Sequence, residues 1–334
     1  MLVVRPAGPA DIEALHELAV LSGRGFTSLP ENEKVLASRL ELSAASFAGS
    51  IAPPEAWYTL MLEDGSTRRV EGVAGIRAAI GLKRPHFSFR TITLAQYSSA
   101  IGTRFDHQAL VLVNECGGRT EVGSLFVRPE QRRGGAGRLL ARARYMLIAA
   151  EPLRFSQIVM AELRGWFDEA GRSPFWDGVA SKFFRLPFEE GDRLVTATDG
   201  QFLLDLAPRH PIYAELLAES AQAAIGQVNR DGMGALNLLE REGFERSGLI
   251  DIFDGGPTMT CARDGLATVR TGRSLRVAIG EHRETSSRLL SSSTIDGFRA
   301  TMSAIAMENG QAILSAEVAD GLRLRAGDLV RIAD

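Results

Sequence analysis

The sequence "SLFVRPEQRRGGAGRLLARARYML", residues 124–147, contains the stretch that decides the fold. Leu125 to Val127 are strand-forming residues that Pro129 ends, and the run from Leu139 to Ile148, apolar apart from its arginines, has the length of a helix. We therefore expect a strand, a glycine-rich turn and a helix in direct succession. The turn contains two arginines and three glycines: Arg132, Arg133, Gly134, Gly135 and Gly137.

A junction of this kind predicts an anion-binding site. The first N–H groups of a helix have no partner inside the helix, and the helix dipole adds roughly +0.5 charge there. Glycines let a ligand approach the backbone closely. The pattern is neither the GxGxxG loop nor the P-loop, so the expected ligand is a phosphate group outside those two classes. The alternative is an ordinary glycine-rich connection flanked by solvated arginines.

The composition is that of a globular enzyme. The chain has 334 residues, 45% of them apolar and 24% charged, which excludes disordered and fibrous classes. A net charge of −3 provides no field for a polyanion, so no nucleic acid partner is expected. The two cysteines, Cys116 and Cys261, are too few for a disulfide framework or a cysteine-based zinc site, which favours a cytoplasmic location.

The order of the expected elements predicts an α+β fold around a mixed sheet. The chain opens with a short strand and an amphipathic helix and not with a signal peptide, and no apolar run reaches the ~20 residues that cross a membrane. Residues 56–64 and 70–81 indicate two strands, and residues 105–129 another pair across Gly117 and Gly118. From about residue 265 the chain indicates a small β-rich domain.

Four further segments carry a resemblance to a known family. They are "SPFWDGVASKFF" (173–184), "HPIYAELL" (210–217), "IGQV" (225–228) and "IDIFDGGPT" (250–258). Together they resemble the arginine N-succinyltransferase family over nearly the whole chain, and the glycine turn resembles the pyrophosphate-binding turn of GNAT acyltransferases. The resemblance implies a GNAT-like mixed β-sheet flanked by helices. We divide the chain into an acyl-CoA-binding domain (1–190), a second GNAT-like half that contributes to the acceptor site (191–264) and the β-rich domain (265–334).

The resemblance also implies an activity. Members of the family transfer a succinyl group from succinyl-CoA to the α-amino group of L-arginine in arginine catabolism, with succinyl-CoA as co-substrate and no tightly bound cofactor. It implies a homo-oligomer or an assembly with a paralogous subunit. The backbone at Leu125 is implied to bind succinyl-CoA, while its side chain can still pack in the core. The implied CoA-binding residues are Leu125, Val127, Arg132, Arg133, Gly134, Gly135, Ala136 and Gly137.

The position of the family's proton donor is changed in this chain. The family pattern reads "GQVH", whereas this sequence reads "GQVN" and has Asn229 there. An amide does not titrate near neutrality, although it donates and accepts hydrogen bonds. Three alternatives follow: Asn229 orients the reactants, the proton donor is dispensable because a thiolate with a pKa near ~8.5 leaves unprotonated, or activity is altered or lost.

Other candidate residues are carboxylates and a histidine. His210, beside Pro211, is a candidate acid–base group, with a structural role as the alternative. Asp251 and Asp254 are candidates for binding the acceptor's guanidinium, or equally for capping a hairpin. Glu31, with Glu33, is a weaker candidate at a helix start.

Several classes of site have no support in the sequence. His86, His107 and His282 have no supporting context, and no spacing indicates a metal site or a serine hydrolase. Two alternative functions remain: an acyltransferase acting on another amine such as ornithine, or a catalytically weakened regulatory or structural subunit.

Overall fold

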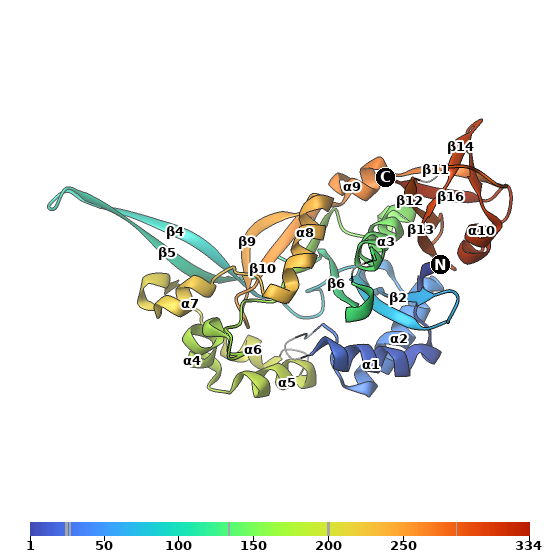
Figure 1. Ribbon diagram of the computed structural model, residues 1–334. Coiled ribbons are helices and arrows are strands. Elements are labelled where there is room, and N and C mark those ends of the chain that lie inside the picture. The colour runs from blue at the N-terminus through green and yellow to red at the C-terminus, as the bar shows by residue number, and fades with distance from the viewer. Residues whose placement is uncertain (24–25, 27, 133, 199–200, 285) are drawn as a thin grey trace.

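The computed structural model describes residues 1–23, 26, 28–132, 134–198, 201–284 and 286–334 (Figure 1). Its strands form one mixed sheet in the order β14-β15-β11-β16-β12-β13-β1-β2-β3-β6-β7-β10-β9-β4-β5-β8. This confirms the predicted α+β class. The strands are β1 (Leu2–Pro6), β2 (Trp57–Asp64), β3 (Val70–Arg77), β4 (Ser88–Ser98), β5 (Thr103–Val113), β6 (Thr120–Val127), β7 (Ile158–Glu162), β8 (Ile212–Tyr213), β9 (Glu245–Asp251), β10 (Pro257–Ala262), β11 (Arg273–Ile279), β12 (Ser287–Ser292), β13 (Ala300–Ala304), β14 (Ala306–Glu308), β15 (Gln311–Leu314) and β16 (Leu329–Ala333).

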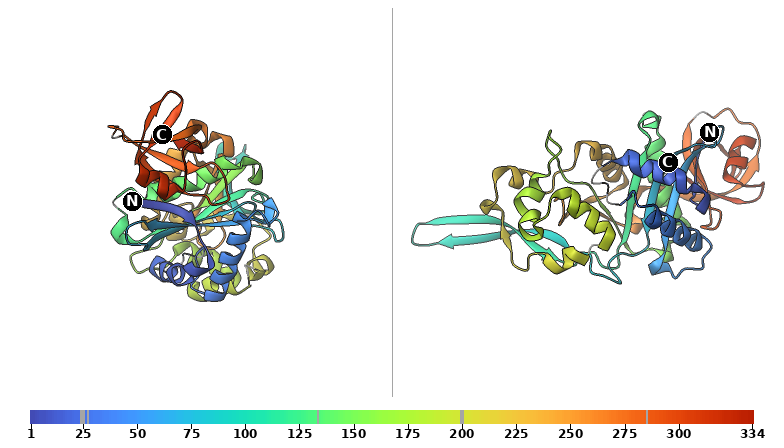
Figure 2. Two further views of the ribbon diagram at one scale, coloured as in Figure 1. Left: turned by 90° about the vertical axis from the view of Figure 1, so that its right-hand side faces the viewer. Right: turned by 90° about the horizontal axis from the view of Figure 1, so that it is seen from below.

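Helices cover both faces of the central strands. Alternate residues of a strand point to opposite faces, so Val73 of β3 packs with the α1 and α2 layer and Ala74 packs with α3. Figure 2 shows these layers from two further sides. The helices are α1 (Ile12–Ser22), α2 (Glu33–Phe47), α3 (Ala136–Ala150), α4 (Ser181–Phe184), α5 (Phe188–Thr198), α6 (Gln201–Leu206), α7 (Glu219–Ala224), α8 (Met233–Glu242), α9 (Ala267–Thr271) and α10 (Ala316–Leu322).

The strand, turn and helix predicted from residues 124–147 are present as β6 and α3. Helix α3 is almost wholly buried, including Arg142 and Arg144, because it lies under both the central sheet and the C-terminal strands. Arg142 donates to the hydroxyl of Thr268 at 3.0 Å, and Glu242 accepts from the same hydroxyl at 3.0 Å. These contacts join α3, α8 and α9 through one buried polar group.

The predicted pairing of the two strands within residues 105–129 is wrong. Strands β5 and β6 are both present, but β5 pairs along its whole length with β4, and β6 pairs with β3. Strand β4 was not predicted from the sequence, and its eleven residues, Ser88 to Ser98, form a complete antiparallel ladder with β5. The long hairpin therefore takes β5 away from β6.

The later parts of the chain supply strands to the same sheet. Within residues 191–264, β9 and β10 lie between β7 and β4. Residues 265–334 supply β11 to β16 and α10, which have a hydrophobic cluster of their own around Val277, Leu290 and Ile332. A single pair, Val4 with Ala300, connects these C-terminal strands to β1.

The turn between β9 and β10 is held by close packing. Gly255 has φ +72°, and a Cβ there would lie 2.6 Å from the ring of Phe175. Phe175 is fully buried beside Phe89. This turn has little room for any side chain.

We predict that Gly255→Ala lowers the free energy of unfolding by about 3 kcal/mol, from a left-handed backbone cost of roughly 1–2 kcal/mol plus an overpacking cost of roughly 1–3 kcal/mol. The matched control is Gly49→Ala, because Gly49 has φ +73° and open space around its Cβ position. Urea denaturation of the three proteins measures the difference. Equal losses in the two variants would contradict the contact with Phe175.

Candidate functional site

The ladder between β6 and β7 is short, and both strands continue beyond it. These parallel strands pair only at Thr120 with Val159 and Glu121 with Met160 within the described chain. Beyond that point β6 pairs with β3 alone as far as Val127, and β7 follows β10 to Glu162. Backbone groups on the facing edges are thus open to a ligand, since buried N–H and C=O groups need partners. We call this unpaired place between β6 and β7 the opening.

A β-bulge shapes β6 at this opening. Val73 faces Phe126 and Gly75 faces Gly123, so Ser124 and Leu125 together lie opposite one residue of β3. Ser124 has φ +50°, which is uncommon for a residue other than glycine, and its hydroxyl donates to the carbonyl of Ser28 at 2.8 Å. Bulges bend a strand and change the direction of its groups, and they are frequent beside active sites.

The glycine turn lies where β6 ends and α3 begins. Gly135 caps α3 with φ +81° and has no side chain, so the first N–H groups of the helix lack a side-chain cap. Gly134 and Gly137 have open space around their Cβ positions, so packing within the protein does not require glycine there. Close approach of a ligand explains them better.

Of the two arginines in the turn, the structure describes Arg132. The Nε of Arg132 donates to the carbonyl of Val127 at 3.0 Å, and its guanidinium lies over the ring of Phe126 at 5.4 Å. The charge is therefore fixed beside the end of β6. Arg133 lies outside the described residues.

A histidine–carboxylate pair lies at the end of β7. The Nε2 of His86 is 2.9 Å from Oε1 of Glu162, and both side chains are largely buried, at 23% and 22% exposed. The Glu162 charge raises the pKa of His86 to about 9. Burial by itself raises the pKa of Glu162, but the charge and hydrogen bond of His86 outweigh it and lower that pKa below its usual value. At neutral pH the pair is an imidazolium and a carboxylate.

This pair was not predicted from the sequence. His86 lies in the segment between β3 and β4, and Glu162 follows 76 residues later. No spacing between them signals contact, because the sheet topology brings them together.

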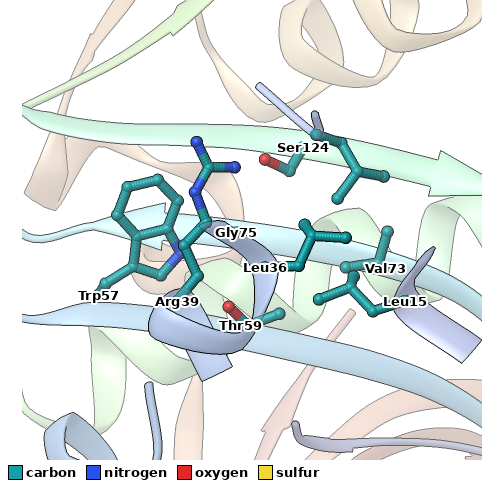
Figure 3. A pocket seen from close by; sticks show the side chains of 9 residues that line it. Leu15, Leu36, Arg39, Trp57, Thr59, Val73, Gly75 and Ser124 are labelled. Atoms are coloured by element: carbon teal, nitrogen blue, oxygen red, sulfur yellow. The ribbon is translucent and has the colours of Figure 1, made fainter. Parts of the chain in front are cut away.

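The same face of the sheet carries further charges and a small pocket. Glu121 of β6 lies 3.4 Å from Arg77 of β3, and the guanidinium groups of Arg39 and Arg77 stack on Trp57 at 4.7 and 5.2 Å. Figure 3 shows Arg39, Trp57 and Ser124 around the pocket, with Leu36 and Val73 at its apolar side. The pocket lies between α2 and the sheet, next to the bulge.

Asp254 is buried and Asp251 is half-buried, and both accept hydrogen bonds from backbone N–H groups. Oδ1 of Asp251 accepts from the N–H groups of Phe253 and Asp254, at 2.7 and 2.9 Å. Asp254 uses both oxygens, accepting from Gly256 at 2.8 Å and from Gly165 at 2.7 Å. Capping is thus present at both positions.

These two carboxyls have raised pKa values. Burial, with the nearby Asp254 and Glu162 charges, raises the pKa of Asp251 to about 8. Burial also raises the pKa of Asp254 to about 6, against the lowering effect of its backbone hydrogen bonds. The site therefore contains more buried acidic groups than ionise together at neutral pH.

Asn229 lies beside the Asp254 turn. Its N–H donates to the carbonyl of Arg164 at 2.9 Å, and its side-chain oxygen accepts from the N–H of Asp231 at 3.0 Å. Val228 forms a bridge with Gly165, the residue that donates to Asp254. The structure thus brings Asn229, Asp254 and Glu162 together around the chain that leaves β7.

Two further sequence candidates, His210 and Glu31, are both exposed. His210 is exposed and precedes β8, which is six strand positions from β6, about 29 Å at ~4.8 Å per strand. Glu31 is exposed before α2, which begins at Glu33 with Asn32 as its N-cap. His210 is therefore not brought to the opening between β6 and β7, whereas Glu31 follows Ser28, whose carbonyl contacts the bulge of β6.

Comparisons with known proteins match the same family along nearly the whole chain. The family described as Arginine N-succinyltransferase beta subunit matches residues 2–268, and its C-terminal domain matches residues 273–334. The chain belongs to the arginine N-succinyltransferase family. It is 38% identical over 334 residues to the arginine N-succinyltransferase of Salmonella typhimurium, covering 99% of this chain and 97% of the relative, and equally similar to that of Salmonella enteritidis.

A solved structure has the same fold. Subunit AI of arginine/ornithine succinyltransferase from Pseudomonas aeruginosa superposes with a TM-score of 0.91 at 32% identity, covering 100% of this chain and 98% of that one. The predicted mixed sheet flanked by helices, with its strand-rich C-terminal region, is confirmed.

Two kinds of feature are absent from the described residues. They contain no helix long and apolar enough to cross a bilayer. They also contain no group of three or more His, Cys, Asp or Glu side chains placed to hold a metal ion.

Proposed function

We propose that this chain transfers a succinyl group from succinyl-CoA to the α-amino group of L-arginine, as an acyltransferase of arginine catabolism. The observation that carries the proposal is an uncapped, glycine-lined helix start directly beside an opened strand ladder. The first suits a pyrophosphate and the second suits a thioester that must reach the sheet's interior. Family membership over the whole chain supports the choice of succinyl-CoA and arginine.

Succinyl-CoA is bound in this proposal as a co-substrate and not as a resident cofactor. The N–H groups of Ala136 and Gly137, with the Arg132 guanidinium, hold the pyrophosphate at the start of α3. The acyl end follows β6, where the backbone at Leu125 and Val127 contacts it and the bulge directs an N–H toward the carbonyl. Such donors stabilise the oxyanion that forms when the amine attacks.

We predict that Gly134→Glu weakens succinyl-CoA binding at least tenfold, because a carboxylate would face the pyrophosphate. Gly134 has open space around its Cβ position and no left-handed φ, so the change adds charge without strain. Gly134→Gln is the size-matched neutral control. Titration calorimetry with succinyl-CoA measures both, and equal affinities for the two variants would show that this turn is not the phosphate site.

The acceptor approaches from the face opposite α3, where Arg77, Glu121 and Glu162 lie. We propose that Asp251 binds the guanidinium group, because both of its backbone hydrogen bonds use Oδ1 and leave Oδ2 for a ligand. Asp254 uses both oxygens for the turn and is assigned to capping. Glu31 remains a weaker prediction for the same substrate.

We expect Asp251→Asn to raise KM for arginine about tenfold or more, since a charged hydrogen bond contributes about 1.5–3 kcal/mol, while KM for a neutral amino acid changes little. Asp254→Asn is the matched control, and it should lower stability without this selectivity. Steady-state kinetics on both acceptors decide. A similar change for both acceptors in Asp251→Asn would leave capping as its only role.

A second acceptor is favoured by a specific observation. The similar Pseudomonas aeruginosa protein is named an arginine/ornithine succinyltransferase. Ornithine, with a shorter cationic side chain, is therefore the alternative acceptor.

Asn229 favours a different alternative, a catalytically weakened subunit, because its side chain caps a turn and cannot donate a proton as an acid does.

We propose that the chain assembles with another succinyltransferase chain, a copy or a paralogue, through the β4–β5 hairpin. The hairpin projects from the body (Figure 1), and its outer part pairs only within itself among the described strands, since β9 and β8 reach only its base. Tyr97, Ile101 and Phe105 on it are 69%, 64% and 45% exposed. An isolated hairpin is marginally stable in water, so a covering surface would stabilise it.

We predict that the double change Tyr97→Ser and Ile101→Ser reduces the assembly to single chains at micromolar concentration. Leu153→Ser is the control, because Leu153 is 93% exposed and lies elsewhere. Light scattering after size exclusion gives the masses. An unchanged mass in the double variant, or a single-chain mass for the parent, would contradict the proposal.

A cytoplasmic location also remains a prediction, supported by two free, buried cysteines.

A further inference from the structure

We propose that His86, oriented by Glu162, is the proton donor to the departing sulfur of CoA in this chain. The inference rests on the proposed function and goes beyond it, because it assigns a catalytic residue outside the family's histidine position. It stands on three observations: where the pair lies, what surrounds it, and what the other histidines contact.

The pair lies at the mouth of the opening between β6 and β7. Met160 is the last residue of β7 that pairs with β6, and Glu162 is two residues further on the same face. His86 reaches this face from the segment before β4, where its N–H donates to the side chain of Asn114 at 3.2 Å. A thioester that enters the opening along β6 therefore passes this pair.

An unsatisfied hydroxyl marks the same place. Thr258 of β10 lies directly opposite Glu162 in the β7–β10 ladder, so the two side chains share a face. The residue is fully buried, and its Oγ1 has no hydrogen-bond partner. Because buried polar groups are nearly always paired, this hydroxyl indicates a ligand or water site beside Glu162.

The surroundings keep the imidazole charged. Glu162 lies 2.9 Å from its Nε2, and the net charge of the groups facing it is negative, which favours imidazolium and raises the pKa of His86. The other titratable groups near the pair are Glu121 on β6, Asp251 at the end of β9, Asp254 in the turn after β9, Arg77 on β3 and Cys116 in the segment between β5 and β6. With Nε2 bound to Glu162, Nδ1 carries the proton that is free to be donated.

The remaining histidines are placed elsewhere. His16 on α1 is near Glu33, and His107 on the hairpin is near Glu215. His210 is at the far edge of the sheet, and His282 lies in the C-terminal region between β11 and β12. Of the chain's five histidines, His86 is the one beside the opening.

The step balances without another reactant. The neutral amine attacks the thioester carbonyl carbon, and the C–S bond breaks with its electron pair on sulfur. Sulfur takes the Nδ1 proton of His86 and leaves as CoA–SH. The nitrogen that attacked carries one surplus proton, which returns to Nδ1 and restores the imidazolium. Glu162 keeps its hydrogen bond to Nε2 throughout and acts as a positioning residue.

The test measures the rate of CoA release from succinyl-CoA and arginine for the parent, His86→Gln and Glu162→Gln. The pH range is about 6–10, which brackets the pKa of His86 near 9. For the parent, kcat should fall as pH rises past about 9. His86→Gln should lower kcat about 10- to 100-fold, with KM for succinyl-CoA little changed. This variant should also lose the high-pH limb of the profile, which is the fall of kcat above about pH 9. Glu162→Gln should keep the limb but move it toward ~6.5, the ordinary histidine value.

Two controls make the outcomes distinct. Glu121→Gln removes a nearby charge that has no hydrogen bond to His86, so it should move the limb less than Glu162→Gln. Nuclear magnetic resonance titration of His86 in the parent and in Glu162→Gln reports its pKa directly, without turnover. If His86→Gln does not fold, the Glu162→Gln profile and this titration carry the test.

The contradicting results are specific. A parent that releases no CoA with arginine overturns the proposed function and this inference together. An active parent whose high-pH limb persists in His86→Gln, or does not follow the measured pKa of His86 in Glu162→Gln, overturns the role of His86 alone.

Discussion

The short ladder between β6 and β7 is the constraint on which the rest of the site depends. Two residue pairs hold these parallel strands together, after which β6 follows β3 and β7 follows β10. An ordinary parallel pair would satisfy its backbone groups along its whole length and leave no entrance. Here the divergence separates β6 from β7 beside the start of α3, and the bulge at Ser124 and Leu125 alters the direction of the groups on one edge. One local break in pairing thus supplies both a place for a thioester and a nearby place for a pyrophosphate.

The divergence also explains why so many acidic groups are buried nearby. The chain leaving β7 passes Glu162 and Gly165, and the turn after β9 packs against it through Asp254. Backbone hydrogen bonds stabilise the carboxylates of this turn, and His86 stabilises Glu162. The raised pKa values of Asp251 and Asp254, to about 8 and about 6, reflect a region that accepts a cation or a proton readily. A basic amino acid is the kind of substrate that such a region favours.

The sequence predicted the parts of this arrangement that are local. The strand, the glycine turn and α3 follow from residues 124–147, because apolar periodicity and glycine placement act over a few residues. The family resemblance singled out Asn229, but its position beside the Asp254 turn came from the structure. The pairing of β5 with β4, the bulge opposite Ala74 and the contact of His86 with Glu162 depend on register between distant segments. His86 in particular has neighbours in sequence that suggest no chemistry, so its role could be inferred only once the topology placed Glu162 beside it.

The central claim is that the thioester enters between β6 and β7 from the start of α3. A crystal structure of the chain with bound CoA tests it most directly. The account predicts the pyrophosphate at the N–H groups of Ala136 and Gly137, and the sulfur between β6 and β7 within about 3.5 Å of Nδ1 of His86, the reach of a hydrogen bond that involves sulfur. A pyrophosphate bound away from the start of α3, or a sulfur on the far side of β7 from β6, would contradict it.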